Sequence, residues 1–105
     1  MHGLQLDVAR QQVWVDGVLR PESLTVHECK LLQALAKCHG EISPRTHTIQ
    51  QVYGTPYFKQ LDDDRLDALV ERTRKKIEDN PRRPRFLRTI HGRGHRLDEY
   101  TGERT

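Results

Sequence analysis

The sequence predicts an α+β fold in which a short antiparallel β-meander, three helices and a C-terminal β-hairpin follow one another. Three observations indicate this order. Apolar and polar residues alternate near the N-terminus, apolar residues recur at helical spacing in successive segments between residues 25 and 79, and a β-rich pattern returns at residues 86–97. A chain of 105 residues has the length of one domain with one modest core, so any binding site is expected on its surface or in a shallow groove.

The first quarter of the chain is predicted to form the N-terminal β-meander. Residues 4–8 (LQLDV) alternate apolar and polar side chains, and residues 12–15 (QVWV) favour strands. Asp16-Gly17 follows at once. This dipeptide is the strongest short-range signal for a two-residue hairpin turn, because such turns need residues that accept a positive φ.

The first helix is predicted to begin at Thr25, where Thr25-Val-His-Glu28 forms a capping box. In this motif the threonine hydroxyl accepts a hydrogen bond from the glutamate backbone amide, and the glutamate carboxylate accepts one from the threonine backbone amide. Apolar residues follow at helical spacing as far as Gly40, the predicted C-terminal cap: Cys29, Leu31, Leu32, Leu35 and Ala36. Cys29 and Cys38 would lie on roughly opposite sides of this helix, so we expect packing residues that form no disulfide with each other.

The second helix is predicted to begin at Ser43-Pro44, an N-cap followed by proline at the first helical position, with Thr46 as an alternative cap. Its buried stripe precedes Gly54 and consists of Ile49, Val52 and Tyr53. A loop with two aromatic residues, Tyr57 and Phe58, is predicted next. These aromatics either pack onto the second helix or form the exposed anchor of a partner interface.

The third helix is predicted to begin at Asp62-Asp63-Asp64, whose carboxylates suit the positive end of a helix dipole, and to end before Asn80-Pro81. Its inward stripe comprises Leu66, Leu69, Val70, Thr73 and Ile77. At 100° per residue the others divide into two strips. One comprises Arg65, Ala68, Arg72, Lys75 and Lys76, and the other comprises Asp67, Glu71, Arg74 and Glu78. A plain solvated helix also carries mixed charge, so its role depends on its neighbours.

The segment 81–97 is predicted to be a stiff connector followed by a hairpin. Prolines flank two arginines in Pro81-Arg-Arg-Pro84, and RTIHGRGHRL, residues 88–97, contains two short strands around a basic glycine-framed tip. Residues 98–105 show no pattern and are expected to form a loose tail, so the domain is expected to span residues 1–97. The core is expected to include Trp14, Leu31, Leu35, Val70 and Phe86.

The charge distribution favours a polyanionic partner. The formal net charge is +3 and the pI about 9.1, but the basic residues crowd between Arg65 and Arg96. The sequence contains no apolar run long enough to span a bilayer, and its N-terminus lacks the apolar core of a signal peptide. A cytoplasmic location is therefore expected.

Catalysis, cofactor binding and metal binding are not expected. The order of elements assembles no Ser/His/Asp or Cys/His set, and Gly92-x-Gly94 lacks the third glycine and the following helix of a dinucleotide-binding loop. His91 and His95 have no nearby cysteine or carboxylate to complete a tetrahedral metal site. One histidine is expected at the hairpin tip and the other in packing.

Strands, three helices and a hairpin with a basic tip, in that order, are the arrangement of a winged helix-turn-helix. From Leu4 to Leu97 the chain resembles the DNA-binding effector domain of OmpR/PhoB-type bacterial response regulators, through VWVDG, LTVHECKLLQALAKCHG, IQQVYG and DDDRLDALVERTRKKIEDNPRRPRFLRTIHGRGHRL. The resemblance implies a four-stranded N-terminal sheet, a three-helix core and a hairpin wing. It also implies a transcriptional regulator that binds double-stranded DNA sequence-specifically, with the third helix in the major groove and the wing on the adjacent minor groove or phosphates.

The resemblance has implications for partners as well. Such domains usually bind direct repeats as tandem dimers, and the loop between the second and third helices, here Tyr57, Phe58 and Lys59, contacts RNA polymerase. The receiver domain of the family has no counterpart in this sequence. The chain is expected to be an effector domain, either as a fragment or as a stand-alone protein.

The resemblance also assigns residues to DNA, position by position. Base reading falls to Asp67, Ala68 and Arg72: Arg72 would bind guanine bidentately, Asp67 would accept from a cytosine amino group, and the Ala68 methyl would touch a thymine methyl. The residues that would contact the DNA backbone are Arg45, Tyr53, Arg65, Lys75, Lys76 and Thr89. The wing tip would present His91 and Arg93.

Several positions depart from the family pattern. Glu71 stands where an arginine is common, and the other departures are Leu69, Thr73, His91 and His95. Two alternative functions follow. One is a winged-helix protein-interaction module that turns Asp67, Glu71 and Glu78 toward a basic partner; the other is nonspecific DNA binding through Arg93 and Lys75.

Overall fold

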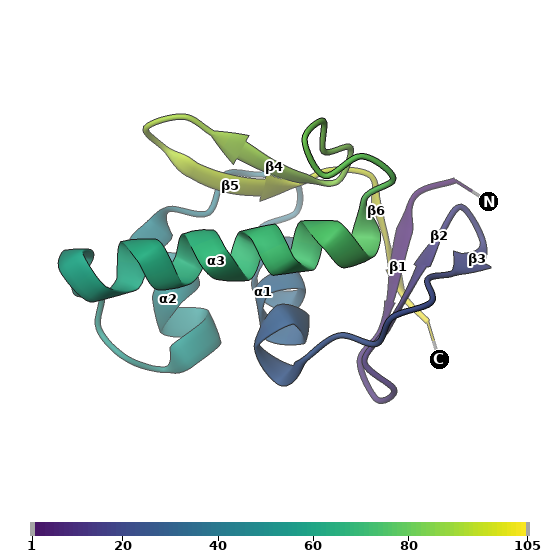
Figure 1. Cartoon of the computed structure of the whole chain (residues 1–105), viewed down its shortest axis with the longest axis horizontal. Helices are drawn as coiled ribbons and strands as arrows, with labels where there is room; N and C mark the ends of the chain where they lie inside the picture. Colours follow the sequence, from purple (N-terminus) through teal and green to yellow (C-terminus); the bar gives the residue numbers. More distant parts are fainter. Residues whose placement is uncertain (1, 105) are drawn as a thin grey trace.

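The structure, a computed structural model, describes residues 2–104, apart from the side chains of Lys59 and Gln60. Strands, three helices and a hairpin follow one another as predicted (Figure 1), so the α+β fold class is confirmed. The elements are β1 (Leu4–Asp7), β2 (Gln12–Val15), β3 (Val18–Leu19), α1 (Val26–Ala36), α2 (Arg45–Tyr53), α3 (Lys59–Ile77), β4 (Leu87–Ile90), β5 (Gly94–Leu97) and β6 (Tyr100–Glu103). In this described part of the chain, no helix is long and apolar enough to cross a membrane.

A four-stranded sheet in the order β3-β2-β1-β6 forms one end of the molecule. β1 pairs antiparallel with β2, and β2 pairs antiparallel with β3 across Asp16-Gly17. The φ angles of Asp16 and Gly17 are 51° and 82°, as a two-residue type I′ turn requires. The predicted hairpin is therefore confirmed.

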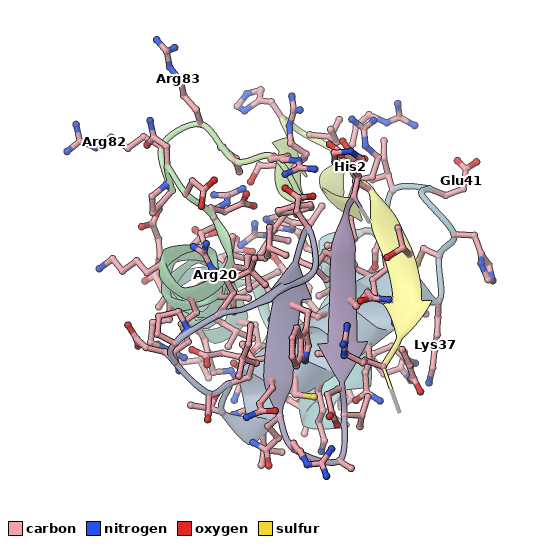
Figure 2. The ribbon with its side chains drawn as sticks, turned by 90° about the vertical axis from the view of Figure 1, so that its right-hand side faces the viewer. His2, Arg20, Lys37, Glu41, Arg82 and Arg83 are labelled. Atoms are coloured by element: carbon pink, nitrogen blue, oxygen red, sulfur yellow. The ribbon has the colours of Figure 1, made fainter. Side chains whose placement is uncertain are left out.

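The fourth strand, β6, shows that the expectation of a loose tail was wrong for residues 100–103. β6 pairs parallel with β1, and the two strands lie side by side in Figure 2. The Leu4 amide donates to the Glu99 carbonyl at 2.9 Å, and the Arg104 amide donates to the Leu6 carbonyl at 2.8 Å. The sheet is thus four-stranded, but its last strand comes from the C-terminal part of the chain. YTGE has no strand pattern of its own, and its order comes from β1.

Trp14 is not a core residue, contrary to the prediction. Its neighbours Val13 and Val15 are buried in the core, so Trp14 points to the opposite face of the sheet. There the Arg104 guanidinium lies 3.7 Å from the centroid of its ring. The other predicted core residues are buried: Leu31, Leu35, Val70 and Phe86.

The capping box of α1 is confirmed, but the helix does not extend to the predicted C-terminal cap, Gly40. The Thr25 amide donates to Glu28 Oε1 at 2.8 Å, and the Glu28 amide donates to Thr25 Oγ1 at 3.2 Å. The helix ends at Ala36 with Lys37 as its C-cap. Gly40 lies in the turn that follows the helix, and its positive φ of 84° is a conformation that glycine adopts readily.

Neither proposed N-cap of α2 is correct. Pro44 occupies the N-cap position and no side chain caps the helix. Ser43 is fully buried and its hydroxyl lies 2.7 Å from Thr48 Oγ1, so its hydrogen bond goes into the core rather than to the helix amides. Gly54 ends α2 with a φ of 70°, as predicted.

α3 begins at Lys59, earlier than the predicted start at Asp62. The Asp62 carboxylate lies in the first turn and accepts the Phe58 amide at 2.7 Å, which is the stabilisation that an acidic group gives a helix N-terminus. The predicted inward stripe is confirmed, with every member at most 2% exposed: Leu66, Leu69, Val70, Thr73 and Ile77.

The wing, formed by β4 and β5, packs against the segment that precedes α2. Ser43 and His95 exchange two backbone hydrogen bonds of 2.8 and 3.1 Å. Gly94 has a φ of 141°, and a Cβ atom at this position would lie 2.1 Å from the Ser43 carbonyl oxygen. The close approach of the wing therefore requires glycine. His95 is 1% exposed and His91 is exposed at the tip, which confirms the predicted division between the two histidines.

Candidate nucleic-acid interface

The exposed face of α3 lies opposite the buried stripe, with the wing running alongside the helix (Figure 1). Its exposed residues recur every three or four positions, so they form one continuous surface: Asp64, Ala68, Glu71, Arg72 and Lys75. The buried leucines fix the rotation of the helix, and this fixes which side chains are presented. The base-reading prediction for Ala68 and Arg72 thus falls on exposed positions.

Arg72 is the most available of the cations in the middle of α3. Its side chain is 54% exposed, and its Nε lies 4.0 Å from Glu28 Oε2. At this distance the guanidinium is attracted by the carboxylate but makes no hydrogen bond to it. Its donors remain able to bind a second group.

Asp67 is exposed, but one of its carboxylate oxygens already has a partner. Arg45 donates to Asp67 Oδ1 at 3.0 Å and to Asp63 Oδ1 at 2.9 Å, which joins α2 to α3. Burial lowers the pKa of Arg45, but the hydrogen bonds that it donates to Asp63 and Asp67 outweigh burial and raise that pKa. Arg45 and Asp67 therefore form an interhelical pair, a relationship that the sequence did not reveal.

Lys76 does not share the exposed face to which it was assigned. Its side chain is 17% exposed, and its Nζ lies 2.7 Å from Glu28 Oε1 and 2.8 Å from the Ser23 carbonyl oxygen. Although burial raises the pKa of the Glu28 carboxyl, the hydrogen bonds from Lys76 and Thr25 lower it below its ordinary value. Lys76 thus ties α3 to the N-terminus of α1.

The packing of the wing divides the second predicted strip of α3, which comprises Asp67, Glu71, Arg74 and Glu78. Arg74 donates to the Leu87 carbonyl at 3.0 Å and to Thr89 Oγ1 at 2.6 Å, and burial lowers its pKa. Glu78 is 3% exposed. Its carboxylate accepts the amides of Arg85, Phe86 and Leu87, which anchors the start of the wing. The continuous acidic strip of Asp67, Glu71 and Glu78 does not exist, because Glu78 faces inward.

Arg65 and Tyr53 meet between α2 and α3. The Arg65 guanidinium lies 3.6 Å from the centroid of the Tyr53 ring, and Arg65 Nη2 donates a hydrogen bond to Asp62 Oδ1 at 2.6 Å. Burial raises the pKa of Tyr53. The structure brings these two predicted backbone-contact residues together at one end of the α3 face.

A groove of about 370 Å³ separates the wing tip from the beginning of α2, and no pattern in the sequence indicated it. Its lining includes four of the predicted DNA-contact residues, Arg45, Thr89, His91 and Arg93, together with Tyr57. His91 and Arg93 are exposed there. The wing tip and α2 thus form two walls of one basic hollow.

The two aromatic residues of the loop before α3 differ in their surroundings. Tyr57 packs against the core and its hydroxyl hydrogen-bonds to Asp63. Phe58 is 62% exposed, and Leu61, which no sequence pattern had distinguished, is 76% exposed. Tyr57 is thus a packing residue of the core whose hydrogen bond leads to α3, its packing onto α2 stays a prediction, and Phe58 is the exposed residue. The side chain of Lys59 lies outside the described part.

The fold and this charged face define a winged-helix domain, and comparison with known proteins identifies its family. Residues 20–97 match the family described as "Transcriptional regulatory protein, C terminal". The chain belongs to this family, whose members include the OmpR/PhoB-type DNA-binding domains.

Individual relatives agree with this assignment. The sensory transduction protein RegX3 of Mycolicibacterium smegmatis is 36% identical over 95 residues, which cover 90% of this chain and 40% of that protein. The DNA-binding domain of Klebsiella pneumoniae RstA, solved in complex with the RstA box, has a TM-score of 0.74 and 26% identity, with 90% of each chain covered. The DNA-binding domain of Escherichia coli CpxR has a TM-score of 0.70 and 29% identity, with 92% of this chain and 91% of that chain covered. The chain spans about 40% of the length of RegX3.

Proposed function

We propose that this chain binds double-stranded DNA sequence-specifically, as the effector domain of a bacterial transcriptional regulator. The third helix enters the major groove, and the wing meets the adjacent minor groove or phosphates. The observation that carries the proposal is the exposed face of α3, with Arg72 at its middle and the basic wing tip beside it. Family membership and the RstA domain solved with its DNA support it. A regulator of this kind works in the cytoplasm, where bacterial DNA lies.

Arg72 is the principal base-reading residue in this proposal. A guanidinium with free donors binds guanine O6 and N7 in a bidentate way, and the Ala68 methyl one turn earlier suits a thymine methyl. Asp67 reads a base with the carboxylate oxygen that Arg45 does not occupy, so its contact depends on the position of Arg45. Base reading and the α2–α3 pair are therefore coupled.

The DNA-backbone residues divide into two kinds. Lys75 and Tyr53 lie on or beside the α3 face, and His91 and Arg93 lie at the wing tip, so these side chains bind phosphates or groove edges directly. Arg65 binds a phosphate with the donors that its hydrogen bond to Asp62 leaves free. Arg45, Lys76 and Thr89 are already bonded to other protein groups. We propose that these three mainly hold α2, α3 and the wing at the spacing that the duplex requires.

Titration with a random-sequence duplex tests this function. NMR amide shifts confined to residues 65–76 and 89–93 are expected at low salt, and they should weaken as the salt concentration rises. On a duplex that carries the preferred site, Arg72→Ala should cost about 1–3 kcal/mol of binding free energy. Lys37→Gln, on the far side of the molecule, should leave binding unchanged (Figure 2). A folded protein whose amides do not respond to duplex would overturn the proposal.

Sequence preference is the second part of the test. Selection of duplexes from a random pool should enrich one motif, and the Arg72→Ala variant should lose that enrichment. Equal affinity for all sequences, with the same salt dependence, would show nonspecific binding instead. The acidic strip that a protein-interaction module would turn toward a basic partner is divided by the burial of Glu78.

We further propose that the loop before α3 binds RNA polymerase and that two copies occupy tandem half-sites. Phe58, at the end of the loop, and Leu61, in the first turn of α3, support the first part, since two large exposed apolar side chains close together suit a protein partner. Phe58→Ser with Leu61→Ser should leave duplex binding intact and reduce transcription from a promoter that carries the selected site. Duplexes with one or two sites should bind one or two copies, respectively, in analytical ultracentrifugation.

A further inference from the structure

The connector between α3 and β4 carries two arginines, Arg82 and Arg83, that the interface described above does not use. Both are exposed, and neither guanidinium has a hydrogen bond or ion pair with any residue that the structure describes. Four basic residues near the connector differ from them. Arg20, Arg74, Lys76 and Arg85 all donate hydrogen bonds to protein oxygens.

The conformation of the connector is fixed although its arginine side chains are free. The Arg82 amide donates to Asn80 Oδ1 at 3.1 Å, and the Arg83 amide donates to the Asn80 carbonyl at 2.9 Å, which closes a turn. Prolines 81 and 84 restrict the backbone on both sides. The loop therefore loses little conformational entropy when its side chains bind.

The two arginines project away from the body of the molecule. In Figure 2, Arg82 points to the left, which is the side on which α3 lies. Arg83 points upward, and the wing also lies at the top of the molecule in Figure 1. Lys75 is exposed on the last turns of α3, and Arg88 is exposed on β4. Arg82 and Arg83 thus extend the basic surface past the C-terminal end of α3.

We propose that Arg82 and Arg83 bind phosphates of the same duplex that α3 reads, so that the connector forms a third DNA contact beside α3 and the wing. This inference rests on the proposed function. A guanidinium without a carboxylate partner presents its full set of donors to a phosphate, and arginine suits the bidentate geometry of that group. The contact sets affinity and register and reads no base.

The test compares Arg82→Gln/Arg83→Gln with Lys30→Gln/Lys37→Gln. Both double variants remove two positive charges from exposed side chains, and Lys30 and Lys37 line a shallow hollow between α1 and α2. Affinity for a short random-sequence duplex that holds one copy is measured by fluorescence anisotropy from about 50 to about 200 mM salt. The slope of log affinity against log salt should flatten by about 0.9 for each phosphate that the variant no longer binds, or about 1 to 2 in the arginine variant. The lysine variant should retain the wild-type slope.

The outcomes separate this inference from the proposed function. A wild-type protein that binds duplex, together with an arginine variant that keeps the wild-type slope, would overturn the connector contact alone. A wild-type protein that binds no duplex would overturn both. A weaker affinity seen only with duplexes long enough for two copies would assign the arginines to a contact between copies, and this also overturns the proposal.

Discussion

Lys76 and Glu28 join the C-terminal half of α3 to the N-terminus of α1, with Lys76 Nζ 2.7 Å from Glu28 Oε1. The Glu28 side chain is 1% exposed, and the same carboxylate oxygen accepts the Thr25 amide in the capping box of α1. One buried acid therefore both begins α1 and fixes the helix that we propose enters the major groove.

Replacement of Lys76 by methionine should destabilise the fold. The change removes the hydrogen-bonded cation of the buried Glu28 carboxylate and leaves only the more distant Arg72. Breaking a fully buried pair costs about 3–5 kcal/mol, and the partial exposure of Lys76 places this loss at or below the lower end, about 2–3 kcal/mol. Urea unfolding measures the loss. Lys75→Met is the matched control: Lys75 is exposed, so its free energy of unfolding should change by at most about 0.5 kcal/mol. Equal effects in the two variants would show that the Lys76 pair contributes nothing.

His95 should make stability depend on pH. Burial, followed by the positive charges of Arg45 and Arg74, lowers its pKa from 6.5 to about 4 in the folded protein. Between these values the unfolded chain binds a proton that the folded chain does not, so stability falls as the pH decreases from 6.5 and levels off below about 4. The shift corresponds to about 3 kcal/mol.

The measurement for His95 is urea unfolding at pH 7 and at pH 5. The wild type should lose stability between the two, and His95→Tyr should lose less because its side chain does not titrate in this range. His91→Tyr is the control, since His91 is exposed at the tip. The same pH dependence in the wild type and in His95→Tyr would contradict the assignment.

A methyl group at Gly94 should displace the wing, whereas one at Gly92 should not. An alanine Cβ at position 94 would lie 2.1 Å from the Ser43 carbonyl oxygen, while at position 92 nothing lies within 4 Å. Gly92→Ala should cost about 1–2 kcal/mol, because its φ of 73° is unfavourable for alanine. Gly94→Ala should cost about 3 kcal/mol or more. The amide shifts of Ser43 and His95 report whether the wing has moved, and unchanged shifts in Gly94→Ala would contradict the close packing.

Glu71→Arg should strengthen duplex binding. Glu71 is exposed on the α3 face and repels phosphates, so reversal of its charge removes a repulsion and adds a contact. The salt slope should steepen by about 0.9 for one new phosphate contact. Glu41→Arg makes the same charge change on the side of the molecule away from α3, and its slope should match that of the wild type (Figure 2). A steeper slope in Glu41→Arg as well would show that net charge, not position, sets the affinity.

The features that the sequence predicted correctly depend on neighbours close in the chain. The capping box at Thr25 and Glu28, the Asp16-Gly17 turn and the cap at Gly54 each involve residues within one turn of one another. The stripe of α3 follows from helical periodicity, which is also local. These signals determined the order of the elements, and family resemblance then supplied the winged-helix arrangement.

The features that the sequence did not predict depend on distant partners. Lys76 and Glu78 look like ordinary charged residues of a helix end, but the first is held by α1 and the second by the start of the wing. Arg45 looks like a free phosphate ligand until α3 brings Asp63 and Asp67 beside it. Helical periodicity assigns a side chain to a strip, but packing decides whether that strip remains a surface.

The parallel pairing of β6 with β1 determines when the sheet can be completed during synthesis. The two strands come from almost opposite ends of the chain, so β1 keeps an open edge until residues 100–103 leave the ribosome. An open edge strand is a template for pairing with other chains. For a nascent copy of this domain, the last strand to emerge is the one that protects the first.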